Sequence, residues 1–162
     1  MSRSFVFLII TIITGVILSI ATLFDASPTP SAFNDFNDHK KYTITIDKIP
    51  ILVEVAHTPE QREKGLSGRE FLPMDEGLLF IFNESKKYAF WMKNMHFPID
   101  IIWINEKFLI VDIIENISPA SFPEIFEPQK TARYVLEINA GWAAKNGIHF
   151  GMFVDGLQPI PR

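Results

Sequence analysis

The stretch Ile99–Ile117, with the sequence IDIIWINEKFLIVDIIENI, indicates the fold class of this 162-residue chain most directly. Its two arms, Ile99–Ile104 and Phe108–Ile117, are rich in Ile, Val and aromatic residues and flank the polar triplet Asn105-Glu106-Lys107. This pattern predicts a β-hairpin. Because both arms are apolar almost without interruption, we expect strands that are covered on both faces.

Shorter apolar segments on either side of this hairpin predict further strands. These segments are Tyr42–Ile46, Ile51–Ala56, Leu78–Phe82, Tyr88–Met92, Tyr134–Ile138 and Met152–Leu157. The third and fourth of them are expected to pair as a second hairpin across a polar loop. The sequence therefore predicts a mainly β fold, an antiparallel β-sandwich of jelly-roll or barrel-like character.

Two short helices complete the predicted domain. Thr58-Pro59-Glu60-Gln61 has the residues of a capping box with proline at the first helical position, so a helix is expected over 59–64, before Gly65. Residues 139–147 predict a second helix of one or two turns. The proline-containing segment 118–131 predicts a long surface loop.

The N-terminal part differs from the rest of the chain. Residues 5–24 carry no charged side chain and, as a helix, would be about 30 Å long, which is the thickness of a bilayer's hydrocarbon core. Residues 1–24 are therefore interpreted as a membrane anchor or a cleaved signal peptide. Residues 25–41 predict a flexible linker, and residues 42–162 a single β domain. Either interpretation predicts export, with the domain anchored outside the cytoplasm, periplasmic or secreted.

The composition excludes several classes of site. The chain has no cysteine, which excludes disulfides, thiolate catalysis and cysteine-bound zinc. Its net charge of −4, without a basic cluster, disfavours nucleic acid as a partner. His96 lies four residues from Asp100, but Pro98 between them prevents a shared helical face and no other histidine is near in the sequence, so no metal site is expected. No other cofactor is expected. The oligomeric state is left open.

The segment Phe90–Asp100 places polar side chains in an otherwise apolar region, where they must be paired or used. Trp91 is interpreted as a core residue or, alternatively, as a stacking platform for a ligand. Lys93 and Asp100 would form an ion-pair latch or would grip a polar ligand. Arg69 would bind an anionic group or a surface acid. The candidate ligand-binding residues are Trp91, Lys93, Asn94, Asp100 and Arg69.

Several motifs follow one another along the chain. They are Arg62-x-x-Gly65-Leu66-x-x-Arg69-x-x-Leu72, Gly77-Leu78-Leu79-Phe80-x-Phe82, Phe90-Trp91-Met92-Lys93-Asn94-Met95-x-x-Pro98-Ile99-Asp100-Ile101, Tyr134-Val135-Leu136-Glu137 and Gly147-Ile148-x-x-Gly151. In this order they resemble the domain of unknown function 192 family, prokaryotic proteins that are often exported. Ser67 and Met152 depart from the family pattern. The resemblance covers Ile51–Leu157 and implies a compact jelly-roll-like β-sandwich, but no reaction.

Three classes of function remain open. The first is a non-catalytic binding or envelope-associated module for a glycan or another polar ligand, an analogy with jelly-roll lectins. The second is an exported hydrolase of an envelope polymer that uses two strand carboxylates as acid and base. The carboxylates available for this are Glu54, Asp100, Asp112 and Glu137. The third is a structural partner of a membrane complex.

Overall fold

The computed structural model describes residues 40–158 and residue 160. The predicted signal or anchor, residues 1–24, and nearly all of the predicted linker, residues 25–41, lie outside the described residues. Within the described part of the chain, no helix is both long and apolar enough to span a bilayer.

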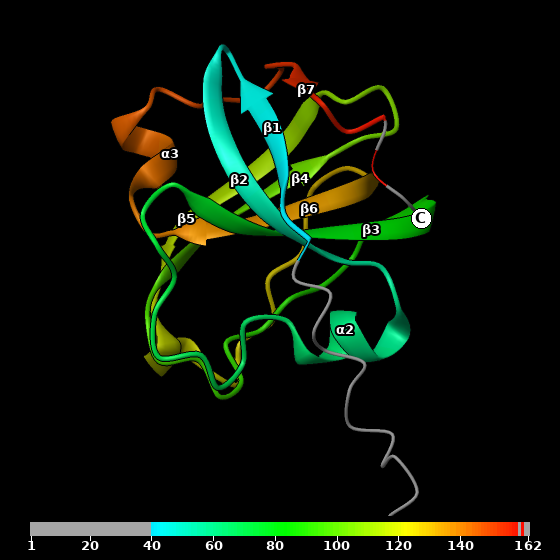
Figure 1. The fold of residues 1–162 in the computed structure, drawn as a ribbon. Coiled ribbons are helices and arrows are strands. Elements are labelled where there is room, and N and C mark those ends of the chain that lie inside the picture. The colour runs from blue at the N-terminus through cyan, green and yellow to red at the C-terminus, as the bar shows by residue number, and fades with distance from the viewer. Residues whose placement is uncertain (1–39, 159, 161–162) are drawn as a thin grey trace, which may run out of the picture. The chain divides into compact units, whose positions relative to one another are not determined.

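Seven strands form one sheet (Figure 1). They are β1 (Tyr42–Ile46), β2 (Ile49–Ala56), β3 (Glu76–Lys86), β4 (Ile99–Ile104), β5 (Ile110–Ile117), β6 (Ala132–Asn139) and β7 (Val154–Asp155). Their order in the sheet is β5-β4-β6-β3-β2-β1-β7. Only β2 and β3 are parallel, and every other neighbouring pair is antiparallel. The mainly β class is confirmed, and the hairpin predicted over 99–117 is β4–β5.

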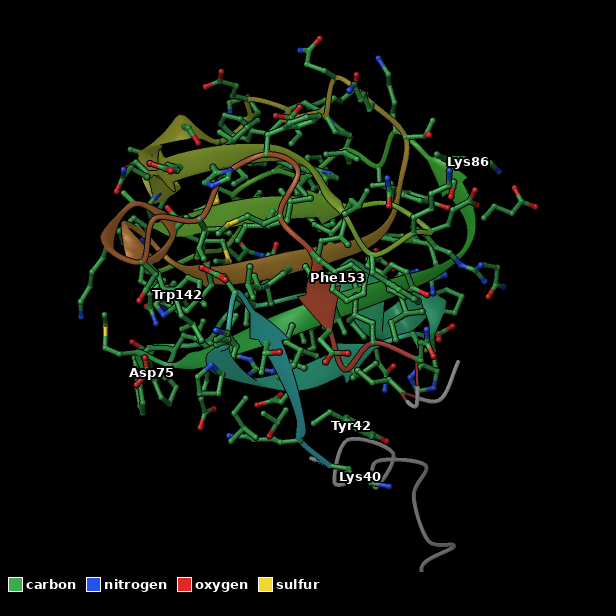
Figure 2. The ribbon with its side chains drawn as sticks, turned by 90° about the horizontal axis from the view of Figure 1, so that it is seen from above. Lys40, Tyr42, Asp75, Lys86, Trp142 and Phe153 are labelled. Atoms are coloured by element: carbon green, nitrogen blue, oxygen red, sulfur yellow. The ribbon has the colours of Figure 1, made fainter. Side chains whose placement is uncertain are left out.

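The sheet curls until its two edges meet. Leu109, just before β5, forms an isolated bridge with Phe153, just before β7, which Figure 2 labels beside the β7 arrow. The N–H of Val154 donates to the carbonyl of Phe108 over 2.8 Å, and the N–H of Ile110 donates to that of Met152 over 2.9 Å. Register shifts in β4–β5 and β3–β6 favour this curvature, because bulges increase twist. The predicted two-sheet sandwich is not confirmed, since the described strands make a single curled sheet.

The hairpin predicted between residues 78–82 and 88–92 is wrong. β3 continues through the polar residues to Lys86, and residues 88–92 keep only an isolated bridge between Phe90 and Phe126. Both edges of β3 are already occupied, by β2 on one side and by β6 on the other. The segment after β3 therefore leaves the sheet and crosses its face.

The predicted helices are confirmed. In α2 (Pro59–Lys64) the Thr58 hydroxyl accepts the N–H of Gln61 over 3.2 Å, and the Gln61 side chain accepts the N–H of Thr58 over 3.1 Å. α3 (Trp142–Lys145) follows β6, and a 3₁₀ turn, η1 (Pro119–Ser121), lies in the predicted loop. Figure 1 shows α2 and α3 on different sides of the sheet.

Both faces of the sheet are covered. One face packs Ile, Val and Leu side chains around Trp142 of α3. The other face carries Phe80 and Trp103, and it is covered by Leu66, Met92 and Met95, from the segments that follow α2 and precede β4. Two charged residues of the described chain are buried with these layers, Asp100 and Glu137. The fold therefore determines where two carboxyl groups lose contact with water.

Candidate functional site

A cavity of about 350 Å³ opens between α2 and the sheet face that carries Phe80. Its walls come from the end of α2 and the turn after it, from β3, and from the segment that crosses the sheet before β4. The lining residues are Arg62, Glu63, Lys64, Gly65, Leu66, Ser67, Phe80, Phe82, Tyr88, Ala89, Phe90, Trp91, Met95 and Glu137. The cavity is at the small end of the roughly 300–1,000 Å³ typical of small-molecule sites.

Glu137 is the buried acid of this cavity. It lies in β6 between Leu78 of β3 and Ile101 of β4, and only 5% of it is exposed. Its Oε2 has no hydrogen-bond partner among the described residues. Burial raises the pKa of the Glu137 carboxyl from 4.5 to about 8, against the positive charge of Arg69, which lowers it. Glu137 is therefore mainly protonated at neutral pH and offers one donor and further acceptor capacity.

Arg69 is engaged by another acid. Its guanidinium donates to both carboxylate oxygens of Glu54 in β2, over 3.0 Å and 2.6 Å. Hydrogen bonding to Glu54 raises the pKa of Arg69, and Glu137 adds a smaller electrostatic contribution. Such a bidentate pair fixes the guanidinium plane. Arg69, predicted as a ligand-binding residue, is thus the partner of Glu54 and is not among the residues that line the cavity.

Gly65 keeps the cavity open beside Glu137. It ends α2 with φ of +51°, where a side chain is strained. A Cβ at this position would stand 3.4 Å from Cζ of Phe80 and 3.8 Å from Oε2 of Glu137. The α2 end therefore approaches the acid with backbone alone.

Aromatic rings form the walls. Phe82 and Tyr88 stack with their centroids 3.5 Å apart, and Phe80 meets Phe90 edge to face at 4.9 Å. The Arg62 guanidinium lies 5.1 Å from the Phe82 centroid and donates to the carbonyls of His57 and Ile81. The aromatic part of the lining is therefore apolar, and ring contacts hold it in place.

Trp91 stands at the cavity mouth and is 51% exposed, so its interpretation as a core residue is wrong. Its ring meets that of Phe122 at 5.9 Å, and the Lys93 ammonium lies 5.3 Å from its centroid. Residues 88–92 do not form a strand, and within this segment Met92 is the buried residue. Trp91 is placed where a ligand in the cavity would touch it.

Asp100 has a structural role. Its carboxylate is fully buried and accepts three backbone N–H groups, from Asn116 over 2.8 Å, Gly141 over 3.0 Å and Ala143 over 2.9 Å. It therefore ties β4 to the end of β5 and to the start of α3. The predicted latch exists at Asp100, but its partner is the backbone and not Lys93.

Residues 42–156 match the DUF192 family, described as an uncharacterized ACR. The chain belongs to the DUF192 family. This confirms the resemblance carried by its motifs. No curated protein matches the chain.

Two solved structures are similar to this DUF192 chain. One is a protein from Sinorhizobium meliloti 1021, provisionally described as a transcription regulator, with 33% identity and a TM-score of 0.69 over 73% of this chain and 95% of that chain. The other is a protein of unknown function from Novosphingobium aromaticivorans DSM 12444, with 29% identity and a TM-score of 0.70 over 75% of this chain and 89% of that chain.

Lys93 and Asn94 shape the turn that crosses the sheet in the DUF192 domain. The Lys93 carbonyl accepts the hydroxyl of Ser67 over 2.9 Å, and the Asn94 carbonyl accepts the N–H of Gly68 over 2.8 Å. Asn94 has φ of +56°, a conformation that asparagine tolerates better than most residues. Both side chains are exposed, and neither residue lines the cavity.

The remaining polar candidates lie elsewhere. Asp112 accepts the N–H groups of Ile113 over 2.9 Å and Gln129 over 2.6 Å, so it anchors the loop before β6. His96 contacts Glu70 at 3.2 Å between Nδ1 and Oε1. Among residues 40–158 and 160, no group of three or more His, Asp or Glu side chains is arranged to hold a metal ion.

In the sequence, Glu137 is one of four candidate strand carboxylates, and no local pattern predicts the aromatic walls of the cavity. A signal was present, since Tyr134–Ile138 is an apolar strand whose only charged residue is Glu137. Burying a charged side chain in a strand that is covered on both faces costs free energy, so such a residue is a candidate for a functional role. The pattern did not indicate that α2 would close over it.

Proposed function

We propose that this protein is a non-catalytic, exported binding module that takes a small ligand into the Glu137 cavity. The observation that supports this best is the buried Glu137 carboxyl, whose Oε2 has no partner among the described residues, in an aromatic-walled cavity. An unpaired buried polar atom costs about 1–3 kcal/mol. A ligand that pairs with this carboxyl would remove that cost and gain contact with the aromatic walls.

Export is part of the proposal and rests on the uncharged run of residues 5–24, as a signal or anchor. In this location the ligand would come from the envelope or the medium, and glycans and other polar compounds are the first classes to screen. The description of the Sinorhizobium protein is not transferred, because a net charge of −4 disfavours DNA binding.

Tryptophan fluorescence tests the binding function. Of the three tryptophans, Trp103 and Trp142 are buried, so Trp91 is the one that a ligand at the cavity mouth would contact. We expect a panel of glycans, acids, amides and amines to include compounds that change this emission saturably, and Trp91→Phe to remove the change. Glu137→Gln should weaken binding, whereas Glu115→Gln, exposed on β5, should not. A panel without a saturable response would contradict the proposal.

A hydrolase is the second candidate, and one observation favours it. Glu54 and Glu137 have opposite environments, one paired with Arg69 and the other buried with a pKa raised to about 8, and such divergence is typical of acid–base pairs. Against it, Glu54 is held by Arg69 and does not line the cavity. Turnover of an envelope polymer that both Glu54→Gln and Glu137→Gln abolish would establish catalysis. Co-purification with membrane proteins, without ligand binding, would instead favour the structural role.

A further inference from the structure

The charged groups around Glu137 indicate which ligands the cavity selects, an inference that rests on the proposed function. The end of α2 contributes the cation Arg62 and the anion Glu63 to the lining. Lys93 adds a cation beside Trp91 at the mouth. The entrance is therefore positive on balance, while the acid lies buried inside.

The other elements packed against Glu137 add little free charge. Its neighbours in the sheet, Leu78 and Ile101, are apolar, and Phe80 and Met95, which line the same cavity, are uncharged. Tyr88 is the titratable group contributed by the segment that crosses the sheet at the cavity. Arg69 acts on Glu137 electrostatically, but its guanidinium is bonded to Glu54.

We propose that the cavity binds a small organic carboxylate, whose anionic group accepts a hydrogen bond from Glu137 and whose apolar body lies against the aromatic walls. An O–H···O⁻ bond of this kind is among the stronger hydrogen bonds in proteins. It also gives the unpartnered carboxyl a partner. The positive entrance attracts the anion and disfavours an ammonium ligand, which would have to pass Arg62 and Lys93.

The protonation of Glu137 makes this selection dependent on pH. Burial raises the pKa of Glu137 to about 8, so the proton that the ligand needs is present at neutral pH. Above that pKa the cavity contains a carboxylate that repels the ligand. The apparent affinity for an anion should therefore be constant near neutrality and fall about tenfold per pH unit above pH 8. A cationic ligand would show the opposite trend.

Three probes with one phenyl body and different head groups test this. They are phenylacetate, phenylacetamide and phenethylamine, titrated calorimetrically and by Trp91 emission with the full chain from about pH 6 to 9.5. We expect phenylacetate to bind at least tenfold more tightly than the other two probes at neutral pH, and its affinity to fall above pH 8.

The Glu137→Gln variant should bind phenylacetate more weakly and remove the pH dependence, because glutamine does not titrate. Lys93→Gln should weaken phenylacetate severalfold and leave phenylacetamide unchanged, with Lys145→Gln on α3 as the control.

The outcomes separate this inference from the proposed function. Preferred binding of phenethylamine that strengthens with pH, or equal binding of the amide and the acid, overturns the carboxylate assignment and leaves a binding module. A pH dependence that survives in Glu137→Gln overturns the role of that residue. No binding of any probe overturns the assignment, and a negative result with the wider panel overturns the binding function as well.

Discussion

Glu54 of β2 and Glu137 of β6 stand opposite the same residue, Leu78 of β3, from its two sides. Strands in register present their side chains on the same face, so both acids belong to one row across the sheet. Glu54 accepts two hydrogen bonds from Arg69, whereas Glu137 is buried and has a raised pKa. Arg69 thus forms its hydrogen bonds with Glu54, whereas Glu137 lines the cavity.

Glu137 should make stability depend on pH. Its pKa is raised from 4.5 to about 8, so the folded state holds this proton more tightly than the unfolded chain. The resulting stabilisation is fully present below pH 4.5 and is lost as the pH rises through about 8. We expect the free energy of unfolding, relative to Glu137→Gln, to fall by up to about 1.4 kcal/mol per pH unit in this window. Urea denaturation across the range measures it, with Glu115→Gln as the control, and parallel curves for wild type and Glu137→Gln would contradict it.

The pair of Arg69 and Glu54 should contribute measurably to stability. The two side chains are 31% and 18% exposed, so solvent screens them only in part. We expect Arg69→Met to cost about 1.5–3 kcal/mol, and Arg69→Met with Glu54→Gln to cost less than the sum of the single changes. Chemical denaturation of the four proteins gives the coupling energy. A coupling energy near zero would mean that the bidentate geometry does not persist in solution.

Asp100 should be required for folding and not for binding. Asn keeps one acceptor oxygen, whereas Ala leaves three backbone N–H groups near β4 and α3 without their partner. We expect Asp100→Asn to lose on the order of 2 kcal/mol and Asp100→Ala more than about 3 kcal/mol. Thermal unfolding compared with Asp75→Asn, an exposed acid, measures this. Stability equal to wild type in Asp100→Ala would refute the structural assignment.

Trp91 should be dispensable for stability. Half of it is exposed, so Trp91→Phe is expected to change the free energy of unfolding by less than about 1 kcal/mol. Trp103→Phe should cost more, about 1–3 kcal/mol, because Trp103 is fully buried and donates to the carbonyl of Tyr88 over 3.0 Å. Chemical denaturation of both variants measures the two free energies of unfolding. The red-shifted part of the tryptophan emission should disappear only in Trp91→Phe. A large loss in Trp91→Phe would place Trp91 in the core.

The local sequence determined the elements whose causes are local. The apolar arms of 99–117 specify the hairpin β4–β5, since a short polar loop joins them. Thr58 and Gln61 specify the start of α2, because a capping box involves residues only three apart. The family could also be read from the sequence, since its motifs are spaced along one chain.

Only the tertiary structure decided the sheet's partners and the cavity. Any two strands can exchange the same backbone hydrogen bonds, so the parallel pairing of β2 with β3, the failure of 88–92 to pair and the closure at Leu109 and Phe153 depend on distant segments. A carboxyl changes its pKa only when other groups exclude water from it. Glu137 is buried because the fold places Gly65 beside its Oε2 and Phe80 and Met95 in the same cavity lining, while Arg69 is bonded to Glu54. The sequence thus specified the acid and the strand, and the packing turned them into a candidate site.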